Sequence, residues 1–329
     1  MRVLITGGAG YIGSTVASAC EDSGHEVVVL DDFSTGKREF VENRPLYEGD
    51  IADDALLDRL FSEQQIDAVV HCAAKIIVPE SVAEPLAYYD NNVAKTIHLL
   101  ENLERHGVHR FLFSSSASVY QPDDDFVVTE ESALEPGSPY ARTKFMVEMI
   151  LKDFAQASDM RVTSLRYFNP IGTDPKLRSG QQLEKPSHVL AKLLEAWVEQ
   201  STFTVTGISW PTRDGSGIRD FIHVWDLARA HVAALEHFDE VTRDEPYQVY
   251  NIGTGNGVTV KELAACFEKV SGTPLQIKFG DPRPGDVAGV YTVSQKAKRE
   301  LGWQAELTEV DAVRDAIAWL PQRKEMLGY

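Results

Sequence analysis

The stretch RVLITGGAGYIG, residues 2–13, decides the fold class of this chain of 329 residues. Its first residues, Arg2–Thr6, are mostly apolar and predict a buried strand, and a helical pattern runs over residues 11–23. Glycines separate the two elements at the spacing GxxGxxG: Gly7, Gly10 and Gly13. Glycine at these positions permits a tight turn, close approach of a pyrophosphate to the backbone, and close packing of helix on strand. The stretch therefore predicts the first unit of a dinucleotide-binding domain.

A carboxylate after the second predicted strand indicates which dinucleotide binds. The apolar run HEVVVL, residues 25–30, ends at Asp31, and Asp31 follows Gly13 by 18 residues. A carboxylate there accepts hydrogen bonds from a ribose 2′-hydroxyl and repels a 2′-phosphate. The sequence therefore predicts NAD rather than NADP as the cofactor. Lys37 and Arg38 lie near in the sequence and would weaken this preference.

Strands and helices alternate along the first half of the chain. Further strands are predicted at residues 45–49, 68–72, 110–114 and 161–166, and helices at 54–64, 84–106 and 138–157. Such an alternation predicts an α/β protein in which helices cover both faces of a parallel sheet. Together with the glycine motif, it predicts a Rossmann-type doubly wound sheet.

A smaller lobe is predicted after residue 168, where the regular alternation fades. We expect residues 1–168, with a returning segment at about 219–256, to form the NAD-binding domain. Residues 169–218 and 257–329 would form an interleaved C-terminal substrate domain. A cleft between two such units is a common place for a ligand pocket.

The net charge of −18 and the composition exclude several classes of protein. A strongly acidic surface repels nucleic acid and anionic membranes, so neither is expected as a partner. The sequence contains no apolar run long enough for a membrane-spanning helix, and no signal peptide is expected. Its three cysteines, Cys20, Cys72 and Cys266, lack the spacing of a metal site, and reduced thiols in the cytoplasm are expected.

The stretch SPYARTKF, residues 138–145, places a candidate base beside a cation. Ser138 can cap a helix and Pro139 suits its first position, so Tyr140 and Lys144 would lie one turn apart on one face. A phenol has a pKa of about 10 in water, and a nearby ammonium group or the positive ring of NAD⁺ stabilises its phenolate. The pair therefore predicts a general base. The alternative is an ordinary solvated pair on a helix surface.

A run of serines follows the predicted strand at residues 110–114. The sequence SSSA occupies residues 114–117, and residues just beyond the carboxyl ends of parallel strands face the ligand crevice. We expect Ser116 to act there. The alternative is that the serines only cap and turn the chain.

Further motifs occur in order along nearly the whole chain: YYDNNV (88–93), SSSASVY (114–120), SPYARTK (138–144), RYFNPIG (166–172), GIRDFIHVWDLA (217–228) and RPGD (283–286). With GGAGYIG, they make the sequence similar to the extended short-chain dehydrogenase/reductase superfamily. Within it, the chain resembles the UDP-glucose 4-epimerases, also called UDP-galactose 4-epimerases. The glycine and YxxxK motifs alone would indicate only the superfamily.

The resemblance implies a role for each matching residue. Tyr140 would take the proton from the sugar 4-hydroxyl, Ser116 would hydrogen-bond the same oxygen, and Lys144 would contact the nicotinamide ribose and lower the pKa of Tyr140. The residues implied to contact NAD are Gly7, Gly10, Tyr11, Ile12, Gly13, Asp31, Asp50, Ile51, Cys72, Ala73, Asn91, Ser114, Tyr140, Lys144 and Phe168. Those implied to contact the UDP-sugar are Ser116, Tyr140, Asn169, His188, Arg219, Arg283 and Asp286. No metal is implied.

The resemblance implies an NAD-dependent, reversible epimerisation at C4 of UDP-galactose and UDP-glucose through a 4-keto intermediate. A sugar-nucleotide 4,6-dehydratase is one alternative, but it needs an acidic pair where Ala117 and Ser118 stand. A decarboxylase that forms UDP-xylose is another. A non-catalytic NAD-binding regulator is the alternative from a different class, and the presence of both Tyr140 and Lys144 counts against it.

Some positions depart from the family pattern. Ser187 and His188 replace an asparagine pair that often follows the proline at 186, so the sugar and diphosphate contacts of that pair do not carry over directly. We expect His188 to contact a phosphate; the alternative is that it is simply exposed. Four residues beyond Asp286 stands Val290, where some family members have a bulky tyrosine. The smaller side chain suggests that UDP-GlcNAc and UDP-GalNAc are also accepted. An alignment shifted by one residue would put Tyr291 at this place and reverse the inference.

The long helices predicted at 84–106 and 138–157 suggest an assembly. In the family such helices pair across a two-fold axis as a four-helix bundle, and two-fold dimers are the commonest closed assembly. A homodimer is therefore expected. The alternative is that the apolar stripes of these helices only cover the sheet.

Overall fold

The structure, a computed structural model, describes residues 1–121, 125–184, 186, 188–282 and 288–329. At its centre seven parallel strands lie in the order β12 (Tyr247–Ile252), β7 (Arg161–Tyr167), β5 (Arg110–Ser114), β4 (Ala68–His71), β1 (Arg2–Thr6), β2 (Glu26–Asp31) and β3 (Leu46–Glu48). The chain runs outward from β1 to β3, then returns past β1 to β4, so the winding reverses beside β1. The predicted Rossmann-type doubly wound sheet is confirmed.

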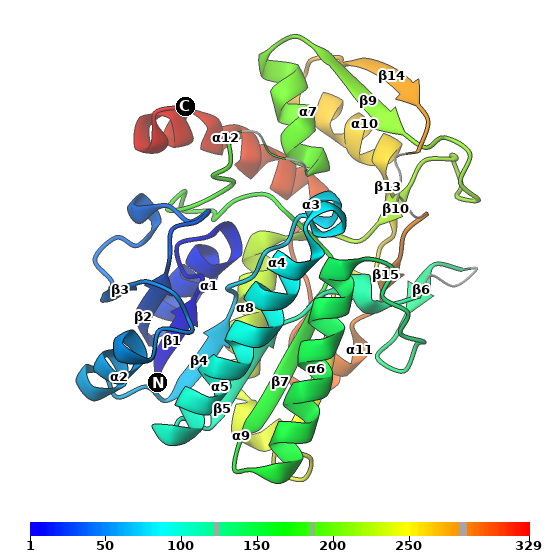
Figure 1. The fold of residues 1–329 in the computed structure, drawn as a ribbon. Coiled ribbons are helices and arrows are strands. Elements are labelled where there is room, and N and C mark those ends of the chain that lie inside the picture. Colours follow the sequence, from blue (N-terminus) through cyan, green and yellow to red (C-terminus); the bar gives the residue numbers. More distant parts are fainter. Residues whose placement is uncertain (122–124, 185, 187, 283–287) are drawn as a thin grey trace.

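Helices cover both faces of the sheet, because its strands are apolar on both faces. On one face, α1 (Tyr11–Asp22) and α8 (Val224–Glu236) share a buried core with the strands. On the other, the core is shared with α2 (Asp54–Glu63), α5 (Lys95–Arg105) and α6 (Pro139–Ala157). Figure 1 shows α5 and α6 lying side by side along this second face.

The long helix expected at 84–106 is interrupted. After the short α3 (Val78–Ala83), the helical run consists of α4 (Pro85–Tyr89), the π-helical turn η2 (Asp90–Ala94) and α5. A π-turn inserts an extra residue into the helix and often marks a functional site. Here it contains both asparagines of the YYDNNV motif.

A smaller lobe packs above the carboxyl edge of the sheet. Its core lies between α7 (Val189–Val198), α10 (Val260–Ser271) and α12 (Glu309–Leu327). Four short strand pairs belong to this region and its junction with the sheet: β9 (Thr202–Thr206) with β14 (Gln276–Gly280), β8 (Asn169–Ile171) with β11 (Phe221–His223), β10 (Ile218–Arg219) with β13 (Val258–Thr259), and β6 (Val127–Val128) with β15 (Tyr291–Thr292). The remaining elements are α9 (Phe238–Val241), α11 (Gln295–Glu300), η1 (Arg38–Phe40) and η3 (Ala117–Val119).

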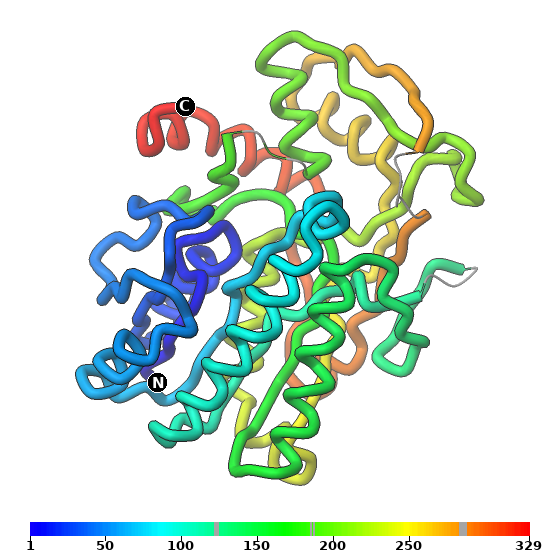
Figure 2. The backbone as a smooth tube through the Cα atoms, in the orientation of Figure 1, coloured from blue at the N-terminus to red at the C-terminus, as the bar shows by residue number. Residues whose placement is uncertain are grey.

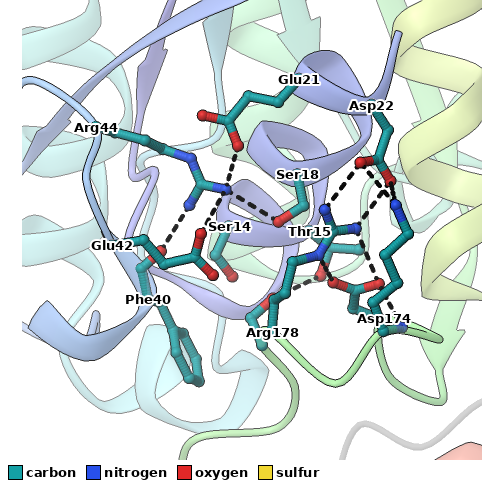
Figure 3. A network of polar contacts seen from close by, with 12 residues as sticks. Ser14, Thr15, Ser18, Glu21, Asp22, Phe40, Glu42, Arg44, Asp174 and Arg178 are labelled. Carbon is teal, nitrogen blue, oxygen red and sulfur yellow. Dashed lines mark hydrogen bonds and ion pairs between the residues drawn. The ribbon is translucent and has the colours of Figure 1, made fainter.

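Polar contacts fasten the segment after β8 to α1 (Figure 3). Asp22, at the end of α1, accepts hydrogen bonds from Lys176 at 2.8 Å and from Arg178 at 3.0 Å, and Arg178 also binds the buried Asp174. Nearer the glycine turn, the Tyr11 hydroxyl donates to the carbonyl oxygen of Gly172 at 2.7 Å. The path that leads into the smaller lobe is therefore attached along the length of the first helix. The predicted division into domains remains a prediction.

The C-terminal helix reaches back over the first strands (Figure 2). Trp319 of α12 packs against Phe40 with ring centroids 6.0 Å apart, and the Tyr329 hydroxyl donates to the carbonyl oxygen of Gln182. Lys37 lies over the Tyr329 ring, 5.5 Å from its centroid. The C-terminal end of the chain thus packs beside the segment that follows β2.

Within the described part of the chain, none of the helices combines the length and the apolar character needed to span a membrane.

Candidate active site

The catalytic pair predicted from the sequence lies at the start of α6. Ser138 caps this helix, since its hydroxyl accepts a hydrogen bond from the Ala141 amide, and Pro139 occupies the first helical position. Tyr140 and Lys144 are both buried, with 8% and 3% of their surfaces exposed. The alternative of a solvated surface pair is therefore wrong.

Burial dominates the acid–base behaviour of Tyr140. It raises the pKa of the phenol above its ordinary value, and a hydrogen bond with the Ser116 side chain lowers the pKa in part. Ser116 itself caps η3 by accepting from the Ser118 amide at 3.2 Å. The structure thus brings the predicted base and the predicted serine together. It does not reproduce the expected lowering of the pKa of Tyr140 by Lys144.

Lys144 is directed at the end of β5. Its Nζ donates to the carbonyl oxygen of Ser114 at 2.7 Å and lies 4.8 Å from the centroid of the Phe113 ring. Burial lowers the pKa of Lys144 to about 8, although charge interactions with Cys72 and Glu148 oppose that change. The ammonium group is therefore held by a backbone oxygen beside the phenol.

Ser114 links this end of β5 to two other elements. Its Oγ lies 3.0 Å from Nε2 of His231 on α8 and 3.2 Å from Sγ of Cys72. Burial lowers the pKa of His231 to about 4 and raises that of Cys72 to about 11, so both groups are neutral at neutral pH. The end of β5 thus brings together three residues that are predicted to contact the cofactor: Ser114, Cys72 and Lys144.

The glycine turn forms a tight cradle. A Cβ atom on Gly13 would lie 2.2 Å from the carbonyl oxygen of Gly7, and one on Gly7 would lie 2.8 Å from the Ala73 nitrogen. Gly7 also has a positive φ of 71°. Only glycine fits such a turn, and the turn leaves the amides at the start of α1 open to an anion. These residues therefore fit the pyrophosphate of a dinucleotide.

Asp31 closes this cradle from the second strand. Its carboxylate is buried and accepts hydrogen bonds from the amides of Ala9 at 2.9 Å and Phe33 at 2.8 Å. Burial raises the pKa of Asp31, and the two amides lower it in part. The nearby Lys37 faces the Tyr329 ring and Arg38 binds Glu48, so both cations are engaged elsewhere.

The other predicted cofactor residues occupy nearby positions with different surroundings. Ile51 is buried in the core, whereas Asp50 is ion-paired with Lys95. Asn91 lies in the π-turn and donates to the side chain of Asn92 at 3.1 Å. The remaining three are Ile12 in α1, partly buried; Ala73, packed beside Gly7; and Phe168, buried against Ala117.

Two predicted substrate residues lie on short strands near the junction of the smaller lobe with the sheet, Asn169 in β8 and Arg219 in β10. Asn169 is the first residue of β8, and its backbone amide donates to the Asp220 carbonyl oxygen at 3.0 Å. Arg219, one residue earlier than Asp220, donates to the Ala288 carbonyl oxygen at 2.8 Å. Arg283 and Asp286 fall outside the described residues.

His188 precedes the first residue of α7, where its side chain makes no capping hydrogen bond to the described residues, and it lines a cavity of about 460 Å³. The cavity lies between α7 and α12, and its walls are largely apolar. Of the predicted site residues, only Tyr11 and His188 line the described part of this cavity. Burial lowers the pKa of His188, so its imidazole is neutral at neutral pH.

Three buried polar groups beside the site were missed by the sequence reasoning. Glu148 binds Arg166 beneath Lys144, and Asn92 donates to Thr143 at 3.0 Å. Asp220 accepts from the Thr254 amide at 2.8 Å, and burial raises its pKa to about 6. Glu148 was foreseeable, because it follows Lys144 by four residues on the same helix. The part of the chain that the structure describes contains no cluster of three acidic, histidine or cysteine side chains suited to a metal.

Comparison with known proteins agrees with this geometry. A model of the NAD dependent epimerase/dehydratase family matches residues 3–253. The chain belongs to this family. The family resemblance inferred from the sequence is confirmed.

Relatives within the family match the chain over its whole length. The UDP-glucose 4-epimerase of Bacillus subtilis is 41% identical, over 100% of this chain and 99% of its own. The structure of a Bifidobacterium longum UDP-glucose 4-epimerase in complex with NAD⁺ and UDP has a TM-score of 0.91 and 37% identity, covering 98% of both chains. A UDP-Glc/GlcNAc 4-epimerase from Campylobacter jejuni has a TM-score of 0.83 and 35% identity, covering 98% of this chain and 99% of its own.

Proposed function

We propose that the protein is an NAD-dependent UDP-glucose 4-epimerase that interconverts UDP-galactose and UDP-glucose. The observation that carries this proposal is the buried contact between Tyr140 and Ser116, with Lys144 one turn away and the glycine cradle at the same edge of the sheet. The glycine cradle and Asp31 would hold NAD, which would supply reversible hydride transfer at C4 of the sugar. The full-length similarity to UDP-glucose 4-epimerases supports the same reaction.

Residues of the chain transfer the proton and bind the substrate. Tyr140 Oη takes the proton of the sugar 4-hydroxyl and gives it back, which leaves a 4-keto sugar in between. Ser116 orients the same sugar oxygen. Lys144 holds a positive charge beside the phenol and the cofactor ribose, which favours the phenolate while the proton is transferred.

UDP would be held at the smaller lobe. Arg219 supplies a guanidinium group, which binds phosphate oxygens in pairs and stays charged at all working pH values. His188 presents a neutral imidazole at the start of α7. Asn169 is the strand partner of Phe221, which follows Arg219 by two residues. Arg283 and Asp286 complete the proposed set. A fixed UDP allows the 4-keto sugar to turn and receive the hydride on its other face.

We further propose that the enzyme accepts UDP-GlcNAc and UDP-GalNAc. Val290 packs beside Ala117 and Phe168, next to the Ser116 turn. The ring of Tyr291 instead packs at Gly257, where an added Cβ atom would lie 2.6 Å from it. The packing of Val290 against this cluster, with the Tyr291 ring at Gly257, supports the alignment that puts Val290 at the specificity position.

A homodimer is proposed from the outer layer of helices. Apolar side chains on α4, α5 and α6 are exposed: Leu86 at 81%, Met149 at 45% and Ile97 at 38%. Figure 1 shows these three helices side by side on one side of the molecule. A face of this kind is suited to pairing with its own copy across a two-fold axis.

One experiment tests the proposed reaction. Purified protein is incubated with UDP-galactose without added nucleotide, and the configuration at C4 is followed by proton NMR. Conversion to UDP-glucose is expected, because the protein should retain NAD. If no conversion occurs even after NAD is added, the proposal is wrong.

A further inference from the structure

An ion pair lies directly beneath the proposed catalytic residues. Glu148 follows Lys144 by one turn of α6 and binds Arg166 of β7 through both carboxylate oxygens, with Nε 2.9 Å from Oε1. Both residues are buried, with 3% and 4% of their surfaces exposed. Buried ion pairs seldom add net stability, because the cost of removing two charges from water offsets their attraction. Net stability alone therefore does not explain why this ion pair lies beneath the proposed catalytic residues.

The carboxylate of Glu148 has a third partner. The Ser115 hydroxyl donates to Oε1, while the Ser115 amide donates to the Leu165 carbonyl oxygen at 2.9 Å. Ser115 stands between Ser114, which receives the hydrogen bond of Lys144, and Ser116, which contacts Tyr140. Two successive turns of α6 are thus each bonded to the serine segment.

We propose that Glu148 is a positioning residue, which acts through the Ser115 hydroxyl to hold Ser116 in register with Tyr140. This inference rests on the proposed epimerase function. The two bonds from α6, Lys144 to Ser114 and Glu148 to Ser115, fix the end of β5 along the helix. A displacement of about 1 Å between reacting groups can reduce a rate by roughly 100-fold.

Glu148 also acts on Lys144 through its charge. The titratable groups that face Lys144 are Glu148 and Tyr140 on its own helix, and Cys72 and His71 at the end of β4. Of these, Cys72 and Glu148 both oppose the effect of burial on the pKa of Lys144, and Glu148 is the one held in an ion pair. Glu148→Gln therefore lowers that pKa further, and Ser115→Ala leaves it unchanged. Ser115→Ala therefore tests the positioning of Ser116 alone, whereas Glu148→Gln also changes the charge beside Lys144.

The test compares Ser115→Ala and Glu148→Gln with the wild type and with Thr163→Val. Thr163 is a matched control, because its hydroxyl is fully buried in β7 and has no hydrogen-bond partner among the described residues. Conversion of UDP-galactose is measured at several pH values. We expect Ser115→Ala to lower kcat roughly 10-fold with KM unchanged, since the UDP contacts lie elsewhere. Glu148→Gln should also shift the alkaline limb of kcat by roughly one pH unit toward lower pH.

The outcomes distinguish this inference from the function on which it rests. A wild type that fails to interconvert the sugars contradicts the proposed function, and the inference with it. If the wild type is active and Ser115→Ala has the kcat of Thr163→Val, the inference alone is overturned. Glu148→Gln can fail to fold, because Arg166 is left without its partner, and Ser115→Ala then decides the result.

Discussion

Nζ of Lys144 lies 2.7 Å from the carbonyl oxygen of Ser114, in a site where 3% of the lysine is exposed. The hydrogen bond compensates in part for the loss of water around the ammonium group, but burial still lowers its pKa to about 8. In the cofactor-free protein the proton on Lys144 is therefore released at a lower pH than from an ordinary lysine. Two properties of the protein should depend on this release, its stability and its rate.

The stability of the cofactor-free protein should rise between pH 8 and 10.5 relative to Lys144→Met. In this range the folded protein has released the Lys144 proton and the unfolded chain, whose lysine has a pKa near 10.5, still binds it. Because the unfolded state then binds more protons, the free energy of unfolding increases with pH, by at most about 3 kcal/mol over the range. Urea denaturation of both proteins at pH 7, 8, 9 and 10 measures the difference. A difference that stays constant with pH contradicts the lowered pKa.

Tyr140→Phe should reduce kcat by roughly 10²- to 10⁴-fold, the usual contribution of a positioned acid–base group. Tyr140 is 8% exposed and the change removes only its hydroxyl, so the melting temperature should change little. Tyr47→Phe is a matched control, since Tyr47 is also buried and its hydroxyl donates to Glu63 at the end of α2 rather than contacting Ser116. The NMR assay with UDP-galactose gives both rates. Equal rates for the two variants would show that Tyr140 is not the base.

Asp31→Ala should weaken the retention of NAD much more than Asp32→Ala. Asp31 is buried and bonded to the Ala9 amide in the glycine turn, whereas Asp32 is exposed and accepts hydrogen bonds from Ser34. The wild type should also bind NAD in preference to NADP, because Lys37 and Arg38 are engaged away from Asp31. Nucleotide released from purified protein by heat is quantified by chromatography. Retention of NADP by the wild type would overturn the assignment of Asp31.

The sequence predicts most of the central sheet to within one or two residues. Strands such as Arg2–Thr6 and Arg110–Ser114 are short apolar runs bounded by turns, and the pattern of apolar residues in the sequence is enough to identify them. The seventh strand, β12, and the short pairs such as β10 with β13 were not predicted. Strands of two or three residues show no periodicity and exist only because a distant segment supplies their partner.

The residues of the candidate site were likewise predicted only where a local sequence motif contains them. Tyr140, Lys144 and Ser116 were identified because each lies inside a local motif, and the helix cap at Ser138 follows from two adjacent residues. The bond from Lys144 to the Ser114 carbonyl oxygen and the pair of Glu148 with Arg166 depend on how α6 lies on the sheet. The raised pKa of Tyr140 was missed for a similar reason, since burial is a property of the fold.

Leu86→Glu should convert the proposed dimer into a monomer. The side chain is 81% exposed on α4, and a charge there would have to be buried between two copies without a partner. Val198→Glu on α7 is the matched control, because it also replaces an exposed apolar residue, at 60%, outside the proposed interface. Light scattering at micromolar concentration gives the mass of each protein. A wild type that is itself monomeric excludes the dimer.

Val290→Tyr should abolish turnover of UDP-GlcNAc and leave turnover of UDP-glucose within a few-fold of the wild type. The added ring would extend from the cluster of Ala117 and Phe168 into the space proposed for the N-acetyl group, whereas a 2-hydroxyl needs less room. Val293→Tyr, three residues later and 40% exposed, adds the same ring outside that cluster and should change neither activity. Rates with both sugars are compared by NMR for the three proteins. The wider specificity loses its basis if the wild type turns over UDP-GlcNAc at less than about a thousandth of the UDP-glucose rate. That ratio corresponds to a loss of transition-state stabilisation of about 4 kcal/mol.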